Sequence, residues 1–130
     1  IHRNGMTIID DCYNANPVSM KASIDVLSKA EGRKIAVLGD MGELGTDERA
    51  LHYAVGEHFA GKGIDRLFCT GELSEEIAKA VRAVSEDTKV YHFTEKEALI
   101  EALKAQCGNG DTILVKASHF MNFAEIVKVL

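Results

Sequence analysis

Two spacings of apolar residues alternate along the chain. Five short runs are continuously apolar and rich in β-branched residues, and between and after them the apolar residues recur every three or four positions. A short continuous run is typical of a strand buried on both faces, whereas the three-and-four spacing is typical of an amphipathic helix. The predicted strands are residues 7–9, 35–38, 67–69, 90–93 and 112–115.

Helices are predicted between and after these strands. Their apolar positions are Met20, Ile24 and Leu27; Leu51, Val55 and Phe59; Leu73, Ile77, Ala80, Val81 and Val84; Leu99 and Leu103; and Phe123, Ile126, Val127 and Leu130. Because strand and helix alternate along the whole chain, the pattern predicts a mostly parallel sheet with helices on both faces. This is an α/β fold of the Rossmann-like, doubly wound kind.

Local signals at the ends of the elements agree with this pattern. Asn16 is a predicted N-cap with Pro17 at the first helical position, and Thr94 with Glu97 has the spacing of a capping box. The pair Asn4-Gly5 predicts a tight hairpin that leads into the first long strand.

Size and charge narrow the possible functions. A chain of 130 residues with 46% hydrophobic and 27% charged residues fits one globular domain. Its net charge of −5 and the lack of a basic run argue against binding to nucleic acid or to an anionic membrane. No apolar run approaches the roughly 18 to 20 residues that span a bilayer. Three cysteines without a CxxC pair indicate free thiols, so we expect a cytoplasmic protein.

Polar residues follow the predicted strands where parallel α/β sheets bind their ligands, beyond the carboxyl ends. These residues are Asp10, Asp11, Tyr13, Asn14 and Asn16 after the first strand; Gly39, Asp40, Met41, Gly42 and Glu43 after the second; Thr70 and Gly71 after the third; and Lys116, Ser118 and His119 after the fifth. The sequence therefore predicts a ligand site at this edge of the sheet.

The chemistry of these side chains suits a nucleotide. Asp11 can accept hydrogen bonds from both hydroxyls of a ribose, and the amides of Asn14 and Asn16 can donate to and accept from a base or a phosphate. In an alternative interpretation, Asn16 only caps the following helix. His119 beside Lys116 offers donors for a carboxylate or phosphate, or else belongs to the first turn of the last helix.

Other motifs carry less information. "GDMGELG" lacks the register of a dinucleotide fingerprint and is either a turn or a substrate-lining loop. "GEHFAGKG" nearly matches a phosphate loop, but Gly63 replaces the hydroxyl that holds magnesium and the segment ends a predicted helix. The histidines do not have the spacing of metal ligands, and we expect His52 to form a surface pair with Glu48 four residues earlier.

Four motifs in this order resemble one family. "IIDDCYNANPVSM" resembles the DDxYNANPxSM signature of the MurF-type Mur ligases, the UDP-N-acetylmuramoyl-tripeptide:D-alanyl-D-alanine ligases of peptidoglycan synthesis. "VLGDMGELG", "HYAVGEHFA" and "DTILVKASHFMNFAEIV" resemble the family's later segments. In the last motif Ala117 stands where the family usually has Gly, and His119 where it usually has Arg.

The resemblance implies roles for residues of the matching motifs. It assigns Asp11 to the ribose, and Tyr13, Asn14 and Asn16 to the surroundings of the adenosine or phosphates. It assigns a second group to the incoming dipeptide, namely Asp40, Met41, Lys116, Ser118 and His119.

The resemblance also implies a division of labour between domains. It covers the whole chain but only the family's C-terminal domain, so residues 1–130 are expected to be that single domain. The N-terminal domain and the central ATPase domain lie outside this sequence. In such ligases the central domain holds ATP and Mg²⁺, the tripeptide carboxylate becomes an acyl phosphate, and D-alanyl-D-alanine attacks it. We expect no turnover from the domain alone.

Two other functions share part of this pattern. A receiver domain of signalling also has paired acids after strand one and a lysine after strand five, but it needs an aspartate where this chain has Thr70. A stand-alone nucleotide-binding module would bind adenine nucleotides without any partner domain.

Overall fold

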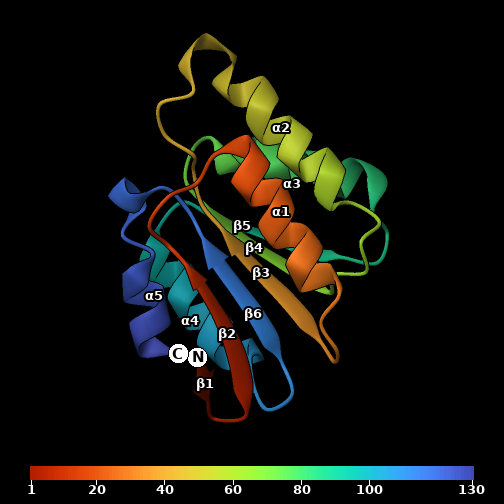
Figure 1. Cartoon of the computed structure of the whole chain (residues 1–130), viewed down its shortest axis with the longest axis vertical. Coiled ribbons are helices and arrows are strands. Elements are labelled where there is room, and N and C mark those ends of the chain that lie inside the picture. Colours follow the sequence, from red (N-terminus) through yellow and green to blue (C-terminus); the bar gives the residue numbers. More distant parts are fainter.

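The computed structural model describes residues 1–130, which form a sheet between two layers of helices (Figure 1). The strands are β1 (His2–Arg3), β2 (Met6–Asp11), β3 (Lys34–Leu38), β4 (Arg66–Thr70), β5 (Lys89–Phe93) and β6 (Thr112–Lys116). The helices are α1 (Pro17–Ser28), α2 (Glu48–Phe59), α3 (Ser74–Val84), α4 (Lys96–Gln106) and α5 (Ala124–Val129), with 3₁₀ turns η1 (Gly45–Asp47) and η2 (His119–Met121).

The strand order is β1-β2-β6-β3-β4-β5, and every pair is parallel except β1 with β2. The chain steps from β3 to β5 in one direction and then returns, so that β6 inserts between β2 and β3. This reversal is a topological switch point, where doubly wound sheets open a crevice for ligands. The predicted fold class is confirmed.

Two apolar cores lie on opposite faces of the sheet. Helices α1, α2 and α3 cover one face, where Met20, Val55 and Ile77 are buried against strand residues. Helices α4 and α5 cover the other face, with Leu99 and Ile126 in the second core. Because both faces are covered, the strands are continuously apolar, as the sequence pattern predicted.

The predicted ends of the elements hold in two places and fail in one. Asn4 and Gly5 take φ angles of 52° and 77°, which form the hairpin between β1 and β2. Asn16 caps α1 by accepting a hydrogen bond from the backbone N–H of Ser19. The capping box predicted at Thr94 is wrong, because α4 begins at Lys96, with Glu95 at the N-cap and no side-chain cap bond.

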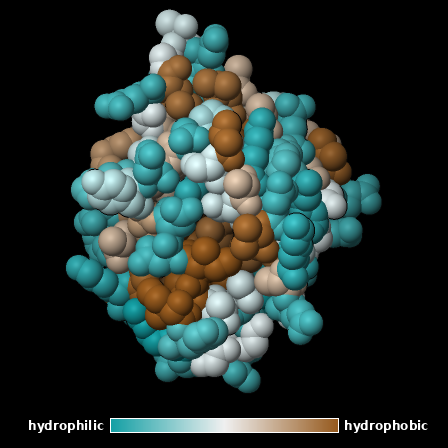
Figure 2. Space-filling model, in the orientation of Figure 1, coloured by the Kyte–Doolittle hydropathy of each residue, from teal (hydrophilic) through white to brown (hydrophobic).

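None of the helices combines the length and the apolar character that crossing a bilayer requires. Figure 2 shows that the face drawn in Figure 1 is largely hydrophilic, with an apolar area that reaches from near the two chain ends toward the centre. Ile1 and Val129 are 51% and 42% exposed.

Candidate functional site

The ends of β2 and β6 are joined by an ion pair. Asp11 and Lys116 are register partners in the sheet, and Lys116 Nζ lies 2.5 Å from Asp11 Oδ2. The side chain of Lys116 is only 1% exposed, whereas that of Asp11 is 42% exposed. Lys116 Nζ also donates to the carbonyl oxygen of Asn14 at 3.2 Å. A buried ammonium group needs such partners, because its desolvation is otherwise costly.

A third residue completes the environment of this carboxylate. Ser23 of α1 donates its hydroxyl to the same oxygen, Asp11 Oδ2, at 3.0 Å. Both contacts therefore use Oδ2, and Oδ1 is left for a ligand at the partly exposed edge of the sheet. The ammonium group of Lys116 and the hydroxyl of Ser23 fix the direction in which Asp11 presents that oxygen.

The loop after β3 is tied to the end of β6 by backbone bonds. The N–H of Gly39 donates to the carbonyl of Lys116 at 3.0 Å, and the N–H of Ser118 donates to the carbonyl of Asp40 at 3.0 Å. The N–H of Gly42 donates to the hydroxyl of Ser118 at 2.7 Å. These bonds join residues 39–42 to residues 116–118.

His52 anchors the same loop from α2. Its Nε2 accepts a hydrogen bond from the backbone N–H of Met41 at 2.9 Å, so Nδ1 carries the proton and donates to the carbonyl of Glu48 at 2.6 Å. The side chain is fully buried. The predicted surface pair between the side chains of His52 and Glu48 is therefore wrong, because the histidine bonds to backbone groups inside the fold.

The side chains of Asp40 and Met41 point into the fold. Asp40 Oδ1 accepts from the N–H of Ser74 at 2.7 Å and Oδ2 accepts from that of Leu73 at 3.2 Å, so this carboxylate caps the N-terminus of α3. Met41 is 1% exposed and belongs to the core under α1, α2 and α3. Neither side chain faces the open edge of the sheet.

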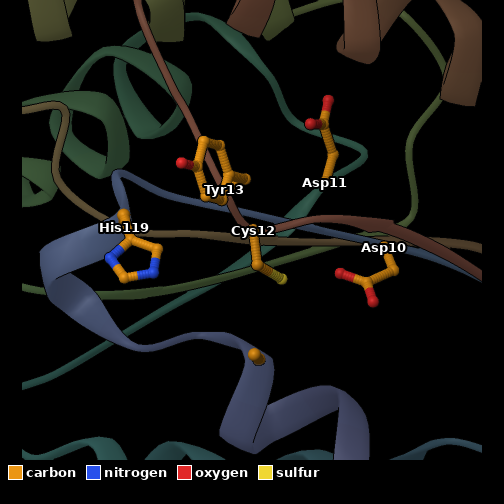
Figure 3. A pocket seen from close by; sticks show the side chains of 6 residues that line it. Asp10, Asp11, Cys12, Tyr13 and His119 are labelled. Atoms are coloured by element: carbon orange, nitrogen blue, oxygen red, sulfur yellow. The ribbon is translucent and has the colours of Figure 1, made fainter.

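Tyr13 and His119 form an aromatic pair at the surface. Their ring centroids are 5.3 Å apart and the rings meet edge to face at 68°. Tyr13 is 80% exposed, and His119 lies in η2, before the last helix begins. Figure 3 shows the two rings side by side, while the carboxylates of Asp10 and Asp11 point to opposite sides of their strand.

The aromatic pair is shared by two hollows. The first, of about 370 Å³, is lined by Asp10, Asp11, Cys12, Tyr13, His119 and Ala124. The second, of about 240 Å³, is lined by Tyr13, Asn14, Gly42, Glu43, Ser118, His119 and Phe120. The candidate site therefore consists of two hollows, and Tyr13 and His119 line both of them.

The cysteines are free thiols, as predicted. Burial, reinforced by the nearby carboxylate of Asp10, raises the pKa of Cys12 to about 12. Burial likewise raises the pKa of Cys107 to about 12 and that of Cys69 further. The thiolate is the reactive form of cysteine. Cys12 therefore lines the first hollow as a neutral thiol and does not act as a nucleophile.

Most of the predicted site residues lie near the carboxyl ends of β2, β3 and β6. Asn16 is exposed next to them, with its side-chain oxygen engaged by the cap of α1. Sequence reasoning missed Ser23 and assigned His52 to a surface pair, because nothing in their local spacing indicates a partner from another element. "GEHFAGKG" forms the end of α2 and the turn after it, which confirms that it is no phosphate loop.

Comparisons with known proteins agree with the motifs. A UDP-N-acetylmuramoyl-tripeptide--D-alanyl-D-alanine ligase of Bacillus subtilis is 44% identical over 129 residues, which cover 98% of this chain and 28% of that protein. The ligase of the same name from Escherichia coli is 41% identical over 95% of this chain and 26% of its own length. The chain thus spans little more than a quarter of these relatives.

The fold is also similar to that of a solved relative. The crystal structure of MurF ligase from Thermotoga maritima in complex with ADP superimposes with a TM-score of 0.82, at 27% identity, over 98% of this chain and 28% of that one. Residues 1–119 match the family model described as Mur ligase, glutamate ligase domain. With the fold, the ordered motifs and this match in agreement, the chain belongs to the Mur ligase family.

Proposed function

We propose that residues 1–130 are the C-terminal domain of an ATP-dependent ligase that adds D-alanyl-D-alanine to UDP-N-acetylmuramoyl-tripeptide in peptidoglycan synthesis. The observation that carries this proposal is the 44% identity to the Bacillus subtilis ligase over 98% of the chain. The N-terminal and central domains of the same protein, the tripeptide and the dipeptide are the proposed partners.

The first hollow is the proposed place of the adenosine. Asp11 Oδ1 has no partner within the chain and is held in direction by the bonds of Lys116 and Ser23 to Oδ2. A carboxylate oxygen fixed in this way suits the two hydroxyls of a ribose. Tyr13 offers a ring face to the base, and the exposed amides of Asn14 and Asn16 offer donors nearby.

The chain's residues do not fit Mg²⁺, because no three side chains of His, Cys, Asp or Glu come together in a way that could hold a metal ion. The phosphate-loop pattern at the end of α2 is also broken. We therefore place the ATP phosphates and Mg²⁺ mainly in the central domain, where ATP would supply the phosphoryl group that activates the tripeptide carboxylate.

The second hollow is the proposed place of the dipeptide. Ser118 and His119 line it directly. Lys116 lies behind Asp11 and Asn14 and acts on the site through them, while Asp40 and Met41 hold the loop that carries Gly42. The domain would thus bring the dipeptide amine to the acyl phosphate and keep water away from it.

The test uses the full-length ligase that carries this domain. Asp11→Asn should raise the KM for ATP about tenfold, because one oriented charged acceptor is lost, and should leave the KM for the dipeptide nearly unchanged. Asp87→Asn is the matched control, since Asp87 is exposed and lies in the turn before β5, at the opposite ends of the strands from the site. Ligation by the domain alone, or tight nucleotide binding by the domain alone, would contradict the proposal.

A further inference from the structure

We propose that Glu43 binds the amino end of the incoming dipeptide and His119 its carboxylate end. The second hollow would then recognise both charges of the zwitterionic dipeptide. This inference rests on the proposed function. It adds a specificity residue, and it gives the dipeptide a direction across the hollow.

The backbone of Glu43 is the first observation. Its φ angle is 60°, in the left-handed region that residues with a Cβ seldom adopt. The other residues with positive φ that are not glycine are Asn4 and Asn122, and asparagine tolerates this region well. Glu43 has no such tolerance, and strained backbone of this kind clusters at functional sites.

Neighbouring bonds hold Glu43 in this conformation. The N–H of Gly42 is fixed by the hydroxyl of Ser118 at 2.7 Å, and the N–H of Met41 by His52 at 2.9 Å. A side chain at position 42 would meet Phe120 Cε1 at 3.0 Å, so glycine lets the loop approach η2 closely. The loop therefore places Glu43 at the rim of the second hollow.

The carboxylate of Glu43 is available to a ligand. Glu43 is exposed, lines the hollow and takes part in none of the chain's ion pairs. It is also the one carboxylate among the lining residues. A negative group at this position repels a phosphate and attracts an ammonium group.

Donors lie among the other lining residues. His119 brings an imidazole whose ring is braced by Tyr13, and Asn14 brings an amide. An imidazole nitrogen that carries a proton donates to a carboxylate. A D-alanyl dipeptide carries one ammonium group and one carboxylate, so its two ends match Glu43 and His119.

The experiment compares Glu43→Gln and Glu43→Gly in the full-length ligase. Both variants remove the charge, and glycine also accepts a φ angle of 60° without strain. We expect the KM for D-alanyl-D-alanine to rise about tenfold in both, with the KM for ATP unchanged. Glu57→Gln, an exposed change on α2, is the matched control and should behave as the unaltered enzyme.

A second measurement tests the direction of the dipeptide. The unaltered enzyme and Glu43→Gln should both prefer the free dipeptide to its C-terminal amide, whereas His119→Asn should lose this preference. An unchanged dipeptide KM in Glu43→Gly, an equal rise of the KM for ATP, or a preference that disappears with Glu43 would overturn the inference. If the unaltered ligase does not use D-alanyl-D-alanine at all, the proposed function itself fails.

Discussion

Lys116 on β6 and Asp11 on β2 form an ion pair in which the amine is almost completely buried and the carboxylate is half-exposed. The lysine thus serves as a fixed support behind a carboxylate that faces outward. Because one side chain is buried and the other faces outward, we expect replacing Lys116 and replacing Asp11 to have different effects on stability and on ligand binding.

Replacing Asp11 by Ala should destabilise the fold. The change leaves the ammonium group of Lys116 with only the carbonyl of Asn14 as partner, so we expect a loss of about 1 to 3 kcal/mol in the free energy of unfolding. Lys116→Met fills the same space without a charge and should cost less than about 1.5 kcal/mol. Urea denaturation checks both values, and a larger cost for Lys116→Met than for Asp11→Ala would contradict this account.

Replacing His52 should loosen the loop after β3. In His52→Phe the buried N–H of Met41 loses its acceptor, which should cost about 1 to 3 kcal/mol of stability. Hydrogen exchange measured by NMR should show faster exchange at Met41 and Gly42. His58→Phe, on the same helix but bonded to Asp25 of α1 and not to the loop, serves as comparison and should leave exchange at Met41 as it was.

Gly56 should not accept a side chain. A Cβ there would lie 2.5 Å from the backbone oxygen of Ile77 and 2.6 Å from the Cβ of Ala80, so α2 and α3 would have to separate. Although alanine favours a helix by about 1 kcal/mol, we expect Gly56→Ala to lower stability by about 1 to 3 kcal/mol. Gly108→Ala enters open space and should be nearly neutral in thermal unfolding.

The stability of the fold should fall in acid partly through Asp111. Burial alone would raise the pKa of this carboxyl group, but hydrogen bonds from Arg33 and from the N–H of Gly108 outweigh it and hold the pKa below the usual 3.8. Because the folded-state pKa is the lower one, the stabilisation is complete above the unfolded-state pKa near 4. It disappears as the pH falls through the folded-state pKa.

Urea midpoints between pH 2 and pH 7 test this dependence. The difference in unfolding free energy between the unaltered chain and Asp111→Asn should be constant above about pH 5 and should shrink below pH 4. A difference that grows as the pH falls would show that the sign is wrong.

The fold was predictable because its signals are local and repeated. Apolar periodicity gave the alternation of strands and helices, and the pair Asn16 and Pro17 marked the start of α1 within one turn. The capping box predicted at Thr94 was wrong because the three-residue spacing from Thr94 to Glu97 does not show at which residue a helix begins.

The contacts of the site were less predictable because they join distant residues. Lys116 and Asp11 are 105 positions apart, and Asp40 caps a helix whose first residue is 34 positions away. His52 looked like half of a surface pair on its own helix, since its spacing from Glu48 says nothing about the loop at Met41. The motifs placed Asp11, Asp40 and Lys116 near the carboxyl ends of their strands but did not show the bonds between them.

The strand order sets a sequence of events for folding. Since β6 lies between β2 and β3, the earlier part of the chain has a vacant position in its sheet until residues 112–116 arrive. Pairings this far apart in sequence close slowly. A nascent chain would therefore complete its ligand site only in its last step of assembly, so that binding competence reports that the whole domain has folded.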